Sequence, residues 1–244
     1  MTDHELWLVA AIAMAVAGVV KGATGIGYAT FALPLLASLV GLKTAMALII
    51  APTLAVNFSL AFSGGQFREN VGAFLPLYLA MLPGVAAGAV MLAIVDQRIA
   101  IGMLGASMVA YAGLALAMPK LSLHEKTARW LRLPVGFING VLTGLTGAQV
   151  IPLVPYMMAL HMPTGQTIQA INIGVLVLSS MLGVSLVATK AVEPLLIGAS
   201  IAGILPALAG AALGASLQSK MPAALLRTLI LTIVGLSGLK LIVW

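Results

Sequence analysis

The sequence predicts an all-α polytopic membrane protein with about 8 to 10 transmembrane segments, on three observations. Of its 244 residues, 61% are hydrophobic and 7% are charged, whereas a soluble domain carries roughly 25% charge. The mean hydropathy is +1.15. The apolar stretches have the length of spanning helices, which need about 20 residues, and not the ~10-residue alternating pattern of a membrane β-barrel. A water-soluble enzyme is therefore excluded, and the lipid bilayer is an expected partner.

Charged residues, Gly/Pro clusters and apolar length divide the chain into ten expected helical segments. The first segment follows Asp3 and Glu5, which have the wrong charge for the basic start of a signal peptide, so we expect a retained helix. The first, second, sixth and seventh segments rise only about 18 to 22 Å, against roughly 30 Å of hydrocarbon, so short, broken helices are expected there. The ten segments are 6–20, 28–40, 44–62, 71–95, 99–118, 133–146, 149–160, 164–188, 194–218 and 222–243.

A basic connection, KLSLHEKTARWLR at residues 120–132, carries four Lys or Arg residues against the single Glu125. Because cytoplasmic loops are enriched in Lys and Arg, we expect this connection to face the cytoplasm and both termini to lie on the other side. The same enrichment accounts for the formal net charge of +6, so nucleic acid is not an expected partner. The predicted organisation is a first transmembrane repeat at 1–119, a cytoplasmic linker at 120–132 and a second transmembrane repeat at 133–244.

Two similar motifs indicate that the halves are homologous. Residues 18–25, GVVKGATG, match residues 140–147, GVLTGLTG, at five of eight positions. Further on, Leu-Pro-Gly at 82–84 corresponds to Leu-Pro-Ala at 205–207. If each half crosses the membrane five times, the second copy is inverted relative to the first. If the second and seventh segments are re-entrant, each half crosses four times and the repeats are parallel. We expect inverted repeats, and the sequence alone does not decide between the inverted and the parallel arrangement.

Each motif is expected to hold part of a substrate site. Short, glycine-interrupted segments at corresponding positions of two repeats are typical of a transporter binding site, and loops at membrane depth must be buried in protein or face a cavity. At residues 24–27, TGIG, one helix would end and the next begin, leaving free N–H groups at the positive end of a helix dipole, which suits an oxyanion. The Thr hydroxyls would add donors. Residues 146–149, TGAQ, offer a comparable arrangement, with an amide from Gln149.

Polar side chains elsewhere in the apolar segments extend this candidate site. Asn57 and Asn172 fall in corresponding helices, and an amide in the membrane needs either a cavity or a partner on another helix. Lys21 is expected to snorkel from a helix end, with electrostatic attraction of the anion as the alternative. The candidate substrate-binding residues are Thr24, Gly25, Gly27, Tyr28, Asn57, Thr146, Gly147, Gln149 and Asn172, with Lys21 as the electrostatic candidate.

The glycines also have a purely structural explanation, because GxxxG spacing lets two membrane helices pack closely. For the pairs in the 71–95 and 194–218 segments, packing is the favoured explanation, since no hydroxyl or amide accompanies them. The four pairs with this spacing are Gly18 and Gly22, Gly84 and Gly88, Gly140 and Gly144, and Gly210 and Gly214.

Several functional classes lack the residues that they need. The chain has no GxxxxGK[ST] phosphate loop, no Cys, only three scattered His and no nucleophile with a base and an orienting group, so we expect no ATP-driven pump, enzyme, metal site or cofactor. All six carboxylates fall at expected helix ends or in loops, so no buried proton relay is evident. Coupling would use sodium held by neutral oxygens, the protonation state of the substrate, or the gradient of the substrate itself.

With these paired motifs, the chain resembles the TauE/SafE family of sulfite exporters over essentially its whole length. The resemblance rests on the glycine-rich motif at 22–27, followed by Pro34, and on the motif at 144–147, followed by Pro152 and Pro155. It implies a transporter of small sulfur-containing anions, such as sulfite and organosulfonates, in the prokaryotic cytoplasmic membrane. The sequence departs from the family pattern at Tyr28 and Gln149, and we expect these side chains to tune the choice of substrate.

Three functional hypotheses follow. The first is a secondary transporter that moves a small sulfur-containing or other oxyanion by alternating access of the two halves. The second is an anion channel with the same site, and the third is a non-transporting membrane scaffold in which the motifs only pack helices. The partners are a small anionic substrate and lipid, and a homo-oligomer is compatible with the sequence.

Overall fold

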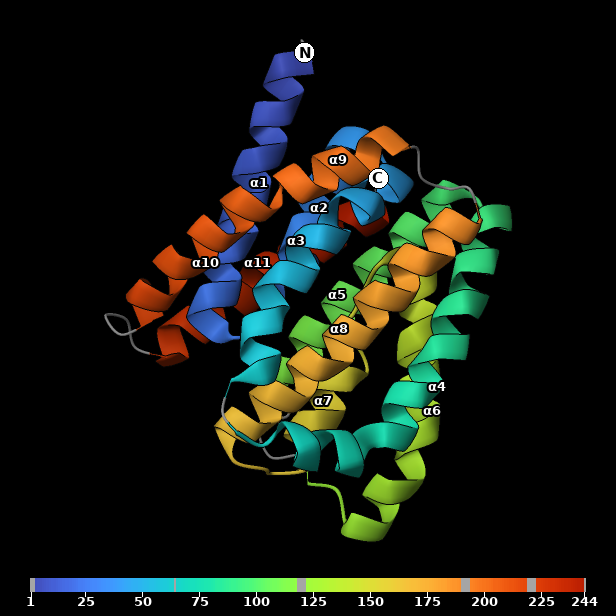
Figure 1. The fold of residues 1–244 in the computed structure, drawn as a ribbon, viewed down its shortest axis with the longest axis vertical. Coiled ribbons are helices and arrows are strands. Elements are labelled where there is room, and N and C mark those ends of the chain that lie inside the picture. Colours follow the sequence, from blue (N-terminus) through green and yellow to red (C-terminus); the bar gives the residue numbers. More distant parts are fainter. Residues whose placement is uncertain (1–2, 64, 118–121, 190–193, 219–222, 244) are drawn as a thin grey trace.

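The computed structural model describes residues 3–63, 65–117, 122–189, 194–218 and 223–243, and within these ranges the chain is helical and joined by turns (Figure 1). The helices are α1 (Asp3–Thr24), α2 (Tyr28–Val40), α3 (Leu42–Phe62), α4 (Phe67–Ile94), α5 (Gln97–Ala117), α6 (Glu125–Thr146), α7 (Leu153–Met158), α8 (Thr164–Ala188), α9 (Pro194–Ala202), α10 (Ile204–Gln218) and α11 (Ala223–Val243).

The fold confirms the prediction of a polytopic helical membrane protein. Large aliphatic side chains such as Leu79, Val90 and Leu213 are more than half exposed, as side chains that face lipid would be. Among the described residues, six stretches are long and apolar enough to cross a membrane: Trp7–Thr24, Leu42–Phe62, Phe67–Ile94, Gln97–Leu116, Thr164–Ala188 and Leu196–Gln218.

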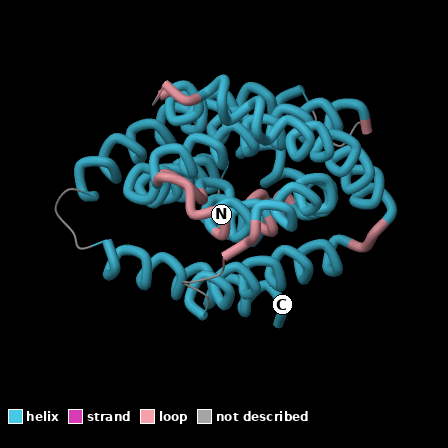
Figure 2. Tube along the Cα trace, turned by 90° about the horizontal axis from the view of Figure 1, so that it is seen from below, coloured by secondary structure: helices cyan, strands magenta, loops and turns pink. Residues whose placement is uncertain are grey.

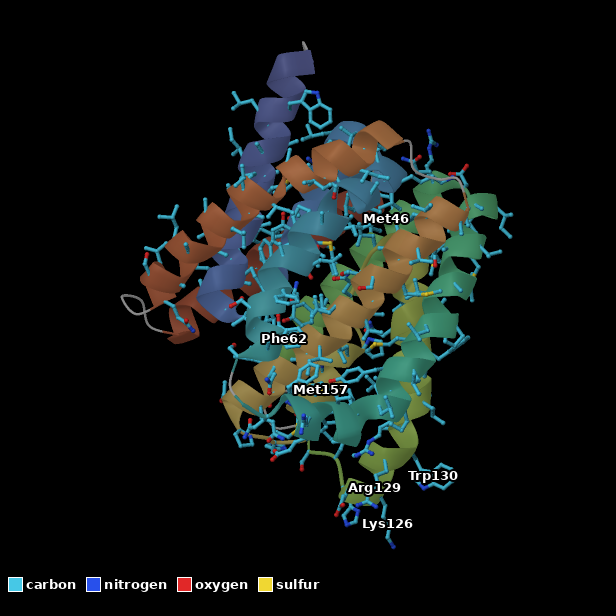
Figure 3. The ribbon with its side chains drawn as sticks, in the orientation of Figure 1. Met46, Phe62, Lys126, Arg129, Trp130 and Met157 are labelled. Carbon is cyan, nitrogen blue, oxygen red and sulfur yellow. The ribbon has the colours of Figure 1, made fainter. Side chains whose placement is uncertain are left out.

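The predicted bounds are right for α2 and α8 and wrong at both helices that precede a Thr-Gly motif. Instead of short segments at 6–20 and 133–146, α1 and α6 each have 22 residues. Helix α1 continues past residue 20 because the polar end of Lys21 is satisfied inside the protein. Helix α6 takes in part of the hydrophilic linker, and Figure 3 shows Lys126, Arg129 and Trp130 at its far end. Of the four segments expected to be short, α2, with 13 residues, and α7, with six, are short.

The expected segment 194–218 is two helices, α9 and α10, with Gly203 between them. A Cβ atom on Gly203 would lie 2.5 Å from Met14 Sδ on α1 and 3.1 Å from Pro52 Cγ on α3. The glycine therefore lets both helices pack closely against the junction of α9 and α10. Pro52 cannot donate to the carbonyl of Leu48. Ser200 compensates, because its hydroxyl donates to Leu48 O at 2.9 Å and accepts from the N–H of Ala51 at 3.1 Å. This contact fixes the middle of α3, which carries Asn57.

Glycine contacts join the two halves reciprocally. Helix α1 packs against α10 and α4 packs against α6, as Figure 1 shows, while α3 contacts α8 and α5 contacts α11. A Cβ atom on Gly22 would overlap the carbonyl of Ala211, and one on Gly88 would overlap the carbonyl of Val141. The GxxxG packing expected for the glycine pairs on α4 and α10 is therefore confirmed, and the pairs on α1 and α6 pack in the same way. The homology and inversion of the halves stay predictions.

Irregular backbone lies in the interior of the bundle. Residues 147–150 are all buried, and Figure 2 shows loop segments in the middle of the molecule with helices around them. Such backbone at membrane depth is tolerated only where protein or a cavity surrounds it. Both chain ends lie in the upper half of Figure 1, whereas α6 begins at the bottom. The sides of the membrane on which the termini and the basic linker lie stay a prediction.

Candidate functional site

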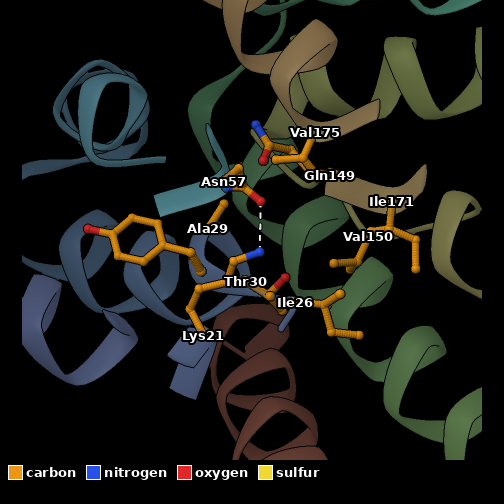
Figure 4. A pocket seen from close by; sticks show the side chains of 11 residues that line it. Lys21, Ile26, Ala29, Thr30, Asn57, Gln149, Val150, Ile171 and Val175 are labelled. Atoms are coloured by element: carbon orange, nitrogen blue, oxygen red, sulfur yellow. Dashed lines mark hydrogen bonds between the residues drawn. The ribbon is translucent and has the colours of Figure 1, made fainter. Parts of the chain in front are cut away.

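Lys21 is the buried cation at the centre of the candidate site. It lies in the last turn of α1 and is 1% exposed. Its ammonium donates hydrogen bonds to Gly25 O at 2.7 Å, to Asn57 Oδ1 at 2.7 Å and to Asn172 Oδ1. Figure 4 shows the bond to Asn57. The expectation that Lys21 snorkels is wrong, because these oxygens replace the water that a snorkelling side chain would seek.

Each asparagine is held by its own helix. The Nδ2 group of Asn57 on α3 donates to Thr53 O at 2.6 Å, and that of Asn172 on α8 donates to Ile168 O at 2.6 Å. With the nitrogens used in this way, both side-chain oxygens are directed at Lys21. The two residues thus link α1, α3 and α8 through one ammonium, and Asn57 also lines the cavity beside it.

The charge of Lys21 has no counter-ion in the described part of the chain. All three of its acceptors are neutral carbonyl or amide oxygens. The ion pair seen among the described residues, Arg129 with Glu125, is at the exposed start of α6. A buried charge is costly unless it is paired. The described residues therefore do not balance the charge of a protonated Lys21.

A small cavity lies between Lys21 and the start of α2. Its volume is about 10 Å³, roughly the room that one water molecule needs. Gly27 precedes α2 with φ 91°, and no side chain caps the helix. The N–H groups of the first turn, at residues 28–30, have no acceptor within that helix, and they lie at the positive end of its dipole. Figure 4 shows side chains that line this cavity: Lys21, Ile26, Ala29, Thr30, Asn57, Gln149, Val150, Ile171 and Val175, with Gly27 and Tyr28 completing it.

Gln149 brings the second half of the chain to this cavity. Its Nε2 group donates to Ser179 Oγ on α8 at 2.9 Å, which orients the side chain. The small cavity thus combines a cation from α1, a helix N-terminus from α2 and an amide from the loop after α6. Tyr28 and Gln149, the two departures from the family pattern, both lie here.

The threonines of the two motifs do not supply free donors. Thr24 Oγ1 lies 2.8 Å from both Val20 O and Ile26 O, which share its single proton, and Thr146 donates to Leu142 O at 2.7 Å. Each hydroxyl therefore ties down the end of its own helix, where Gly25 and Gly147 both have φ 77°. These hydroxyls are therefore not free donors in this structure, and a contact between them and the substrate stays a prediction.

The second motif does not form an open helix N-terminus like the first. The N–H of Leu153, at the start of α7, donates to Asn139 Oδ1 at 3.0 Å. A Cβ atom on Gly147 would lie 2.8 Å from the Leu33 side chain, so this glycine allows close packing. Thr146 and Gly147 do not line the small cavity. The two motifs share a helix-end geometry, but of residues 146–149 only Gln149 borders the small cavity.

Thr30 is a site residue that sequence reasoning missed. It is 5% exposed, and its hydroxyl has no partner in the described structure. It lines the small cavity and also a neighbouring one of about 330 Å³. The sequence signal that could have identified Thr30 is its position in the first helical turn after Gly27. The larger cavity is lined by Ala23, Thr24, Ile26, Gly27, Thr30, Phe31, Tyr111, Ala115, Met158, Thr164, Gln218, Ile230 and Leu231.

Comparison with known families agrees with this geometry. Residues 10–241 match the family model described as sulfite exporter TauE/SafE. The chain belongs to the TauE/SafE family. No curated protein and no solved structure matches it. This TauE/SafE protein is thus a membrane exporter of sulfite or related anions by family, and not an enzyme.

Replacing Thr30 with Val in the TauE/SafE protein is expected to weaken anion binding and to leave the unfolding temperature unchanged or slightly higher. The valine has nearly the same shape and loses a hydroxyl that has no protein partner. Thermal unfolding with and without the anion measures both effects. Thr24→Val serves as the control, because its hydroxyl holds the helix end; this variant should lose stability. An unchanged anion affinity in Thr30→Val would remove Thr30 from the site.

Proposed function

We propose that this TauE/SafE protein is a secondary transporter that moves a small sulfur-containing oxyanion, sulfite or a sulfonate, across the prokaryotic cytoplasmic membrane by alternating access. The observation that carries the proposal is the buried ammonium of Lys21, whose hydrogen-bond partners are all neutral. An anion beside it would supply the missing counter-charge.

The oxyanion would be held mainly by donors other than Lys21. An ammonium has three N–H donors, and all three are used by Gly25, Asn57 and Asn172. Lys21 would therefore attract the anion by its charge. Hydrogen bonds would come from the N–H groups at the start of α2, the free hydroxyl of Thr30 and the amide of Gln149. Of the residues expected from sequence, Gly27, Tyr28, Asn57 and Gln149 stay in this site, while Gly25 and Asn172 hold Lys21.

The sizes of the two cavities favour a transporter over an anion channel. The small cavity, at about 10 Å³, is too small for a sulfur oxyanion, whereas the larger one beside it has about 330 Å³. Ile26, Gly27 and Thr30 line both. Binding would require movement of the start of α2, after which the site is open to one side. A site that must open and close in this way fits alternating access better than a continuous pore.

A thermal-shift screen tests the anion site. The purified protein would be unfolded in detergent with potassium salts of sulfite, sulfate, thiosulfate, sulfoacetate and chloride, and with taurine. We expect a saturable rise in the unfolding temperature with at least one sulfur oxyanion, since a ligand at 100 times its Kd adds about 2.7 kcal/mol of stability. No rise with any anion, in protein shown to be folded, would contradict the proposal. Counterflow of the stabilising anion in proteoliposomes would then separate a transporter from a channel.

A further inference from the structure

We propose that the ammonium of Lys21 occupies a cation site built from carbonyl oxygens, so that this protein carries its own tethered cation and does not use Na⁺. The inference rests on the proposed function, because it names the cation that accompanies the anion in the same site. The proposal excludes coupling to sodium held by neutral oxygens, one of the three coupling modes that the sequence left open.

The cage around the ammonium has the composition of a monovalent cation site. Gly25 O lies just beyond the end of α1, while Asn57 Oδ1 comes from α3 and Asn172 Oδ1 from α8. In secondary transporters, unwound backbone carbonyls and helix C-termini coordinate Na⁺ near the midplane. The negative end of the α1 dipole also favours a cation here. Three neutral oxygens from three separate elements thus converge on one point, and the Lys21 Nζ atom fills it.

The break between α1 and α2 places a site for positive charge and a site for negative charge within a few residues of each other. The C-terminus of α1 faces the cation, and the N-terminus of α2 borders the small cavity. The second half has no equivalent cation, because Thr143 stands at the position that corresponds to Lys21, and its hydroxyl donates to Ala148 O at 2.8 Å. The cage is thus specific to the first half.

The helices around the cage offer no carboxylate as a further ligand. Helices α2, α8 and α10 carry no Asp, Glu, Lys, Arg or His within their described bounds. On α3 the charged residue is Lys43, in the first turn, whereas Asn57 is in the second half of that helix. Removing the Lys21 side chain beyond Cβ should therefore leave a neutral cage with room for a small cation.

Chemical rescue of Lys21→Ala tests the proposal. The wild type, Lys21→Ala and the control Lys43→Ala would be unfolded thermally in ammonium, sodium or choline chloride at equal concentrations. We expect Lys21→Ala to be less stable in choline chloride and to regain stability saturably with ammonium or Na⁺. For the wild type, the unfolding temperature in sodium chloride should equal that in choline chloride, and the same should hold for Lys43→Ala. Lys21→Met should not be rescued, because its side chain fills the cage.

Two results would overturn the proposal. One is a folded Lys21→Ala protein that responds to small cations no more than Lys43→Ala does. The other is a saturable, Na⁺-specific stabilisation of the wild type, a measurement that holds even if Lys21→Ala does not fold. The chloride concentration is constant and no sulfur anion is added, so the cation response is read independently of the anion screen. Rescue without any anion-induced shift would keep the cage and reject the proposed function.

Discussion

Lys21→Met is expected to abolish the stabilisation of the protein by its anion. The substitution keeps an unbranched side chain of similar length but removes the positive charge. Removing one partner of a buried charge pair costs about 2–5 kcal/mol, so the Kd should rise by about 30-fold or more. A titration of the unfolding temperature with the anion found in the screen, alongside binding by isothermal calorimetry, measures this change.

Lys43→Met is the matched control, because Lys43 is a partly buried lysine in the first turn of α3 and does not line the small cavity. It should retain the wild-type Kd. Both variants must elute as a single species in detergent, since Lys21→Met leaves the oxygens of Asn57 and Asn172 without their donor. An anion affinity in Lys21→Met equal to that of the wild type would show that the buried ammonium does not attract the substrate.

Gly22→Ala is expected to reduce strongly the yield of folded protein. The new methyl group would overlap the backbone carbonyl of Ala211, and a backbone atom cannot move aside as a flexible side chain can. Helices α1 and α10 would have to separate, at a cost of about 1–3 kcal/mol or more. Such a cost is a large part of the roughly 5–15 kcal/mol that stabilises a typical protein. The yield of monodisperse protein and its unfolding temperature report the effect.

Gly102→Ala supplies the control for this substitution. Gly102 is inside α5, and a Cβ atom there would meet no atom within 4 Å. This variant should be as stable as the wild type or slightly more so, because alanine is the better helix former by roughly 1 kcal/mol. Equal behaviour of the two variants would mean that the contact between α1 and α10 contributes little to stability.

The helical fold could be predicted because it depends on properties that are local in sequence. The bounds of α2 and α8 follow from apolar length and from the Gly and Pro residues around them. The end of α1 could not be predicted in this way. Lys21 is a helix-ending signal in a local window, and its partners Asn57 and Asn172 are 36 and 151 residues away. Their contact exists only after α3 and α8 have packed against each other.

The candidate site shows the same limit. The motifs at 18–25 and 140–147 indicate where two helices end, but their similarity predicted that both would contribute in the same way to one anion site. Tertiary contacts make them different, since Asn139 occupies the N–H of Leu153 at the second motif. At both motifs the threonine hydroxyl satisfies a nearby carbonyl, at 2.8 Å for Thr24 and 2.7 Å for Thr146. A sequence shows that a residue is polar, but it does not show which of several nearby acceptors its hydroxyl will bind.

The pairing of α1 with α10 also constrains how the protein is made. During synthesis, Gly22 enters the membrane about 190 residues before the partner that covers it, a delay on the order of 10 to 40 s at ~5–20 residues per second. For the first 151 residues of that interval the ammonium of Lys21 also lacks Asn172, its acceptor on α8. Helix α1 must therefore remain in the membrane without its final neighbour until α10 has been made.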